Sequence, residues 1–221
     1  MTKKQFYNKI KKILDGQDKS PMITLEQIKK ELEVEIVTNG KIDKSLLQAF
    51  KRIQKEMENY ERFQKVLVNE NGLYTITNSF YLVTYNENQL PCELIPFIDN
   101  TNDHKYADFN FNHWQDDKKR NLLSLNMDAL KNVYNYNKLH KEENIFILDN
   151  GFTFNLQYFF DILALMEVKG LVEVTLQISD DIHAPMYILG KNANALLLPL
   201  RGTQEQIEAR KSIQKKILEE G

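Results

Sequence analysis

Acidic and histidine side chains gather in one stretch of the chain, where they could bind a metal ion. They are Asp103, His104, Asp108, His113, Asp116 and Asp117. Carboxylates and imidazoles are common metal ligands, but this spacing matches neither the two-histidine helix of zinc peptidases nor a calcium-binding loop. We therefore predict a polar loop, with no metal and no cofactor.

The remaining residues that could act as nucleophiles or bases do not form a catalytic pattern. His183 lies close to Asp181, but no serine or cysteine stands at a spacing that would complete a catalytic set. The only cysteine, Cys92, is predicted to be a buried, inert thiol in a reducing compartment. None of the 8 glycines builds a phosphate-binding loop. We expect a protein that is not an enzyme.

Composition limits the class of protein further. The chain has 221 residues, with 29 Lys and Arg against 31 Asp and Glu and a net charge of -2. Such a balance does not indicate nucleic acid binding over the whole surface, although a local basic stripe could still contact DNA. No apolar run approaches the roughly 20 residues of a membrane span, and the N-terminus lacks a signal-peptide core. We expect a cytoplasmic protein without membrane contact.

Periodicity predicts the elements that must position any site. Helical apolar stripes occur at residues 2–15, 43–60 and 127–139, and capping pairs predict helices from Thr24 to about Leu32 and from Thr203 to Leu218. Strands are predicted at 32–37, 63–69, 73–77 and 80–85, and a strand, a helix and three further strands between 144 and 201. A strand-helix-three-strand unit therefore occurs twice, at about 32–86 and 144–201, joined by a connecting region at 87–143.

The second unit carries a family resemblance. The residues are Phe154, Asn155, Tyr158, Phe159, Phe160 and Asp161, then Ala184-Pro185, then Leu198-Pro199-Leu200-Arg201. This order resembles the last half-domain of the bacterial DNA sliding clamp, the β subunit of DNA polymerase III. The resemblance implies an α+β fold, with a clamp-like domain at 22–201 whose helices cover one face of antiparallel sheets. A helical extension at 1–20 and a helix at 202–221 are additions to that fold.

The resemblance also implies a peptide-binding groove, because the hairpin Thr77 to Leu82 is similar to one that grips short linear motifs in clamps. Tyr158 would lie nearby, and the tail would supply the opposite wall. The groove residues are Thr77, Phe80, Tyr81, Leu82, Tyr158, Pro185, Leu196, Leu198 and Pro199. The alternative is a plain β-turn with these apolar residues in the core. In clamps the hairpin and the tail belong to adjacent domains, so a chain this short could need a second subunit to complete the groove.

Contact with double-stranded DNA is predicted on the helix at 43–60. Lys44, Lys51, Arg52 and Lys55 lie opposite its apolar stripe and could face phosphates. The alternative is an ordinary solvated helix face. Clamp rings close with six domains, so this chain would encircle DNA only as a homo-oligomer.

The sequence leaves three functions open. The first is a non-enzymatic sliding-clamp-like protein, acting as a replication processivity factor or as a platform that docks a DNA polymerase or repair protein, in a bacterium, a phage or a mobile element. The second is an interaction or regulatory module that keeps the fold without encircling DNA. The third is a DNA-binding regulator that reads DNA with its N-terminal helices.

Overall fold

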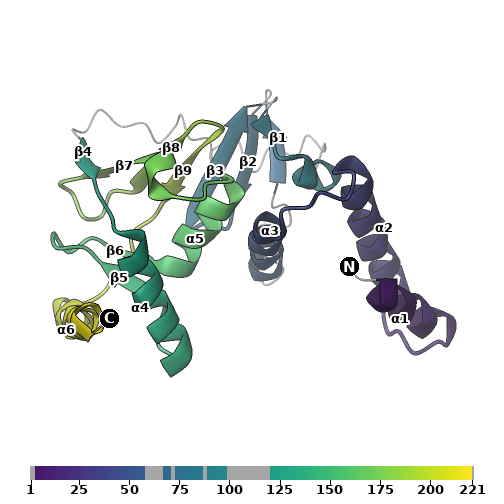
Figure 1. The fold of residues 1–221 in the computed structure, drawn as a ribbon, viewed down its shortest axis with the longest axis horizontal. Helices are drawn as coiled ribbons and strands as arrows, with labels where there is room; N and C mark the ends of the chain where they lie inside the picture. The colour runs from purple at the N-terminus through teal and green to yellow at the C-terminus, as the bar shows by residue number, and fades with distance from the viewer. Residues whose placement is uncertain (1–2, 58–66, 71–72, 87–88, 99–119, 221) are drawn as a thin grey trace. The chain divides into compact units, whose positions relative to one another are not determined.

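The structure is a computed structural model that describes residues 3–57, 67–70, 73–86, 89–98 and 120–220 (Figure 1). The helices are α1 (Lys3–Leu14), α2 (Pro21–Val37), α3 (Lys44–Met57), α4 (Met127–His140), α5 (Leu156–Leu165) and α6 (Gln204–Glu220), with 3-10 helices η2 (Cys92–Phe97) and η5 (Leu171–Glu173). The strands are β1 (Leu67–Glu70), β2 (Leu73–Thr77), β3 (Tyr81–Asn86), β4 (Arg120–Leu123), β5 (Ile145–Ile147), β6 (Thr153–Asn155), β7 (Val174–Ser179), β8 (Met186–Gly190) and β9 (Ala193–Leu197).

The chain divides into two compact units. The smaller one consists of Met1–Lys44 and Leu90–Ile98, and the larger one of Ser45–Gln89 and Asp99–Gly221. The fold of the described residues is α+β, with a large antiparallel sheet and helices, as the sequence predicts. None of the described helices combines the length and the apolar character needed to cross a bilayer.

In the smaller unit the predicted strand at 32–37 is wrong, because these residues form the C-terminal end of α2. The helix starts after Ser20 with Pro21 in its first turn, and it continues until Asn39 and Gly40 adopt positive φ angles of 50° and 76°. The alternating glutamates and aliphatic residues that indicated a strand are also compatible with a helix when no breaker interrupts them.

Cys92, in the smaller unit, was predicted to be buried, and this prediction is wrong. This residue is exposed at the start of η2, and its thiol donates a hydrogen bond to the Glu93 carboxylate over 3.3 Å. Partial burial of the thiol group and the neighbouring Glu93 carboxylate raise the pKa of Cys92. The thiol is therefore less ionised than an ordinary cysteine, even though it is accessible.

The larger unit is built on a seven-stranded antiparallel sheet in the order β1-β2-β3-β9-β8-β7-β4. The six strands β1-β2-β3 and β9-β8-β7 are arranged symmetrically about the β3–β9 pair, and each set of three follows a helix, α3 or α5. Figure 1 shows α3 and α5 beside each other under one face of this sheet. Strand β4 extends the sheet by pairing with β7.

One face of the large sheet carries a row of buried side chains that pack against the helices. Across five adjacent strands the register aligns Ile76, Val83, Ala195, Ile188 and Leu176, all buried. The Tyr85 hydroxyl, on the same side of β3, donates a hydrogen bond to the carbonyl of Leu165 in α5 over 2.7 Å. Successive side chains point to opposite faces of a strand, so this row forms the core between the sheet and its helices.

Strands β5 and β6 form a second sheet, whose strands do not pair with those of the large sheet. Helices α4 and α6 pack against β5 and against each other (Figure 1). The predicted capping pair of the last helix is confirmed: the Thr203 hydroxyl accepts from the Gln206 amide over 3.3 Å, and the Gln206 side chain accepts from the Thr203 amide over 3.0 Å.

Candidate functional site

The predicted hairpin and the predicted tail meet within one molecule. The β3–β9 pairing places Leu82 opposite Leu196, and the amide of Leu198 donates to the carbonyl of Phe80 over 2.9 Å. Pro185 immediately precedes β8, where Met186 is paired with Leu197, so it lies beside the same end of β9. A second subunit is therefore not needed to bring these segments together.

Polar bonds hold the turn at residues 77–81 in one conformation. The side-chain oxygen of Asn78 accepts hydrogen bonds from the amides of Phe80 and Tyr81, each over 3.0 Å, and its nitrogen donates to Glu56 over 2.8 Å. The Thr77 hydroxyl donates to the carbonyl of Tyr81 over 2.7 Å. Ser79 takes a positive φ of 72° between them. The turn is thereby fixed to α3, which fixes the position of Phe80.

The start of α5 presents Tyr158 to this turn. Asn155 caps the helix: its side-chain oxygen accepts from the amides of Gln157 over 2.8 Å and Tyr158 over 3.3 Å. The Phe80 and Tyr158 rings stack with centroids 5.7 Å apart. The tail continues past this point, and the amide of Leu200 donates to the carbonyl of Thr153 over 2.8 Å. The ring pair therefore lies beside the tail.

The predicted groove residues divide into two groups. Thr77, Tyr81, Leu82 and Leu196 are at most 4% exposed and belong to the interior of the protein. Leu82 and Leu196 pack with Tyr187 on the sheet face opposite the helices. The accessible group consists of Phe80, which is 41% exposed, and the half-buried Tyr158, Pro185, Leu198 and Pro199. We call this second group the Phe80–Tyr158 patch.

An ion pair joins α3 to α5 about one helical turn after Tyr158. Arg52 donates from Nε to both Asp161 oxygens over 3.1 and 3.2 Å, and its Nη2 also contacts Asp161. The Gln157 amide donates to the same carboxylate over 2.8 Å and accepts from the Tyr134 hydroxyl over 2.5 Å. The Asp161 side chain is 2% exposed, and this burial raises its pKa, while Arg52 and Gln157 partly offset the rise.

Two further groups lie in the electrostatic field of this ion pair. Burial raises the pKa of Glu56, and the hydrogen bond from Asn78 counteracts part of that rise. The Tyr81 hydroxyl is buried without a hydrogen-bond partner in the described part of the chain. Burial, with the negative Asp161 and Glu56 nearby, raises the pKa of Tyr81 well above its usual range. These carboxylates serve as hydrogen-bond acceptors that join the turn and the two helices.

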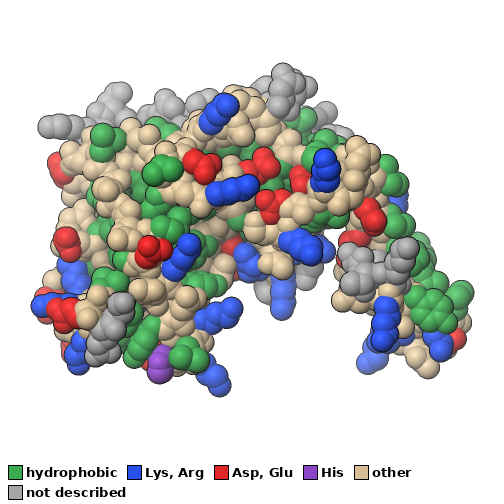
Figure 2. All heavy atoms as spheres, viewed as in Figure 1, with side chains coloured by type: hydrophobic (Ala, Val, Ile, Leu, Met, Phe, Trp, Pro, Cys, Tyr) green, Lys and Arg blue, Asp and Glu red, His purple; other side chains and the backbone are tan. Residues whose placement is uncertain are grey.

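The residues predicted to contact DNA all lie on α3 and are all exposed. Lys44, Lys51 and Lys55 are exposed on α3, and their spacing places them along one side of the helix. Figure 2 shows Lys and Arg side chains gathered over α3. Arg52 is engaged with Asp161, and its side chain is 43% exposed. Contact between these residues and DNA stays a prediction.

Sequence reasoning did not find the polar network. Arg52 and Asp161 are 109 positions apart, and no local pattern links them. Asn78 could have been noticed, because asparagine commonly accepts backbone hydrogen bonds within turns.

The Asp and His residues considered for a metal site lie between 99 and 119, outside the described residues. Among the described residues, no group of three His, Cys, Asp or Glu side chains could hold a metal ion. No family model, curated protein or solved structure matches the chain.

Proposed function

We propose that this chain is a non-enzymatic docking protein of the sliding-clamp type, which captures a short linear peptide motif at the Phe80–Tyr158 patch. The observation that carries the proposal is the meeting of hairpin and tail, through the hydrogen bond from Leu198 to Phe80, beside an exposed aromatic pair. The partner class implied by the clamp resemblance is a DNA polymerase or another replication or repair protein.

The order of the strands supports the clamp-type architecture. Each of the two helices α3 and α5 is followed by three antiparallel strands, and the two sets are joined edge to edge at β3 and β9. Both helices lie on the same face of the resulting sheet (Figure 1). This arrangement is what two related half-domains joined in one sheet would produce. The absence of the first predicted strand, replaced by the end of α2, is a departure from that pattern.

The chemistry of the patch suits an extended peptide with apolar anchors. Phe80 and Tyr158 offer stacked ring surface, and Leu198 and Pro199 add aliphatic surface beside it. Aromatic anchors that need little ordering contribute much of the binding energy in small interfaces. Because Asn78 and Asn155 fix the backbone on both sides, the patch is organised before a partner arrives.

A displayed library of random linear peptides, selected on the full chain, tests this proposal. Fluorescence anisotropy would then compare the selected peptide on wild type, Phe80→Ala and Leu198→Asp, with Leu122→Asp as the matched control at an exposed leucine on β4. We expect a loss of at least about tenfold in affinity for the two patch variants and none for the control. Equal affinity for folded Leu198→Asp would refute the patch as the docking site.

Contact with DNA is the second part of the proposal, favoured by the exposed lysines of α3. Exchanging Lys44, Lys51 and Lys55 for glutamine should weaken binding to duplex DNA and flatten its salt dependence. Solution mass together with retention on circular DNA then separates the functions: a ring-forming oligomer stays on circular DNA and leaves when it is cut. If the protein is strictly monomeric and never associates with circular DNA, it does not encircle DNA, and the docking function alone stands.

A further inference from the structure

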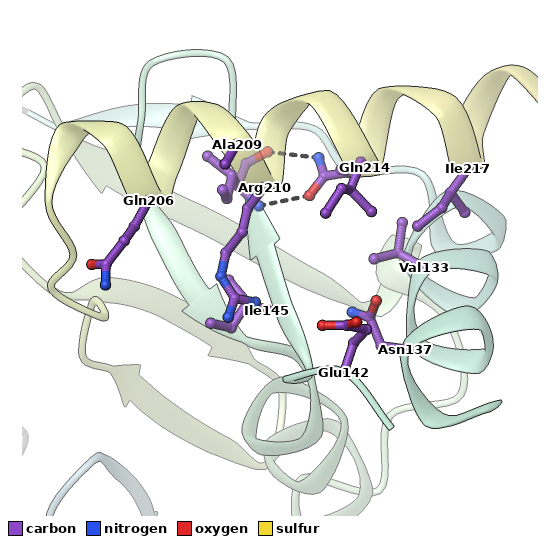
Figure 3. A pocket seen from close by; sticks show the side chains of 11 residues that line it. Val133, Asn137, Glu142, Ile145, Gln206, Ala209, Arg210, Gln214 and Ile217 are labelled. Atoms are coloured by element: carbon purple, nitrogen blue, oxygen red, sulfur yellow. Dashed lines mark hydrogen bonds between the residues drawn. The ribbon is translucent and has the colours of Figure 1, made fainter. Parts of the chain in front are cut away.

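A cavity of about 260 Å³ lies in the larger unit, between α4, α6 and β5 (Figure 3). Aliphatic side chains from all three elements form its walls: Val133, Ile145, Ile147, Ile213 and Ile217. This volume is just below the roughly 300–1,000 Å³ of pockets for drug-sized ligands, so it suits a smaller molecule. It does not involve the Phe80–Tyr158 patch.

The walls of the cavity are held in place by α6. The Gln214 side-chain amide accepts from the amide of Ile147 over 2.9 Å and donates to its carbonyl over 2.8 Å. These Ile147 groups point away from β6, because β5 and β6 exchange their hydrogen bonds through the alternate residues. One glutamine therefore pairs with the open edge of β5 as a strand would, and fixes the helix over it.

Asn137 adds a polar side chain to the lining of the cavity. The residue is 6% exposed on α4, and it lines the cavity (Figure 3). A carboxamide can both donate and accept hydrogen bonds, so Asn137 can meet a polar group of a ligand there.

Charged side chains of both signs complete the lining. Glu142 follows α4, and Arg210 reaches in from α6 (Figure 3). Arg210 is paired with Glu143, yet its side chain is 33% exposed, and a guanidinium has donors beyond those that one carboxylate occupies. A carboxylate ligand group could therefore join this pair, and Glu142 could accept from a ligand ammonium group.

We infer that this cavity binds a small aliphatic zwitterion, with the chemistry of a free branched-chain amino acid. The branched side chain packs on the wall formed by Val133, Ile213 and Ile217, the carboxylate meets Arg210, and the ammonium group meets Glu142. The Asn137 amide, which can donate and accept, hydrogen-bonds to the polar end. The site makes the chain able to respond to a small metabolite, separately from its proposed peptide docking.

Calorimetric titration of the full chain with L-leucine, L-alanine and isoamylamine tests the inference. L-leucine should bind, and at least about tenfold more tightly than alanine, which lacks the branched side chain, or isoamylamine, which lacks the carboxylate. In NMR spectra the side-chain amide signals of Asn137 should shift on addition of L-leucine. No binding of L-leucine, or equal binding of the three probes, would overturn the inference.

Two variants of α6 locate the site. Ala209→Phe places a ring into the cavity, and Ser212→Phe places the same ring on an exposed position outside it. L-leucine binding should fall at least about tenfold in the first and stay unchanged in the second. Unchanged binding by Ala209→Phe would place the ligand elsewhere and contradict the assignment. If Ala209→Phe does not fold, the Asn137 amide shift decides the location in the wild-type chain.

Discussion

Exchanging Arg52 for methionine should destabilise the larger unit because it leaves the Asp161 carboxylate buried with only Gln157 as a partner. Breaking a buried ion pair costs roughly 3–5 kcal/mol. The Arg52 side chain is 43% exposed, so solvent already screens part of this interaction, and we expect a loss of about 2–3 kcal/mol. For a domain of this size the melting temperature should fall by about 5–10 °C.

The sign of the pH dependence follows from Asp161. Burial raises the pKa of this carboxyl, and removing Arg52 removes a contribution that lowers it. A group that binds its proton more tightly in the folded state stabilises the protein at low pH, and this stabilisation is lost as the pH rises through the folded-state pKa. The Arg52→Met variant should therefore lose more stability at neutral pH than in acid.

Urea unfolding followed by circular dichroism, in neutral and in acidic buffer, measures both effects. Lys44→Met, at the exposed start of α3, serves as the control for loss of a positive charge. The double variant Arg52→Met with Asp161→Leu should return to within about 1 kcal/mol of wild type, because no buried charge remains unpaired. If Arg52→Met costs no more than Lys44→Met, the ion pair does not join the helices as described.

Three further variants test the turn, the buried hydroxyl and the edge of β5. Asn78→Ala should cost about 2–3 kcal/mol in urea unfolding, because the amides of Phe80 and Tyr81 lose their acceptor; a loss below that of Asn194→Ala, a half-buried asparagine of β9, would contradict this role. Tyr81→Phe should leave stability unchanged or raise it by about 1 kcal/mol, since the hydroxyl has no partner among the described residues, and a clear loss of stability would show that it has one. Gln214→Ala should speed hydrogen exchange at the Ile147 amide, whereas Gln204→Ala, whose side chain donates to Glu208 on the surface, should not. Equal exchange rates in the two variants would refute the edge pairing.

The elements with strong periodicity could be predicted from the sequence. The helix at 127–139 and the capping of the last helix by Thr203 follow from local patterns, and the structure confirms both. The strand at 73–77 is likewise found as β2. In contrast, Leu32–Val37 has an alternating pattern that a helix also tolerates, and its continuation from Pro21 without a breaker favours the helix.

The site could be predicted only in outline. Phe80, Tyr158 and Leu198 come together within one molecule, whereas the sequence left open whether a second subunit would be needed. Their exposure depends on strand register, which sequence patterns do not determine. That register buries Leu82 and Leu196 on the opposite face of the sheet. The partnership of Arg52 with Asp161 connects two helices distant in the chain, so nothing near either residue in the sequence indicates it.

The central claim is that the Phe80–Tyr158 patch docks a linear peptide, and one affinity measurement tests it most directly. A peptide selected on the full chain is titrated against wild type, Leu198→Asp and Leu122→Asp by fluorescence anisotropy. Our account predicts at least about a tenfold loss for Leu198→Asp alone. Equal binding by all three folded proteins, or no selectable peptide, would contradict it.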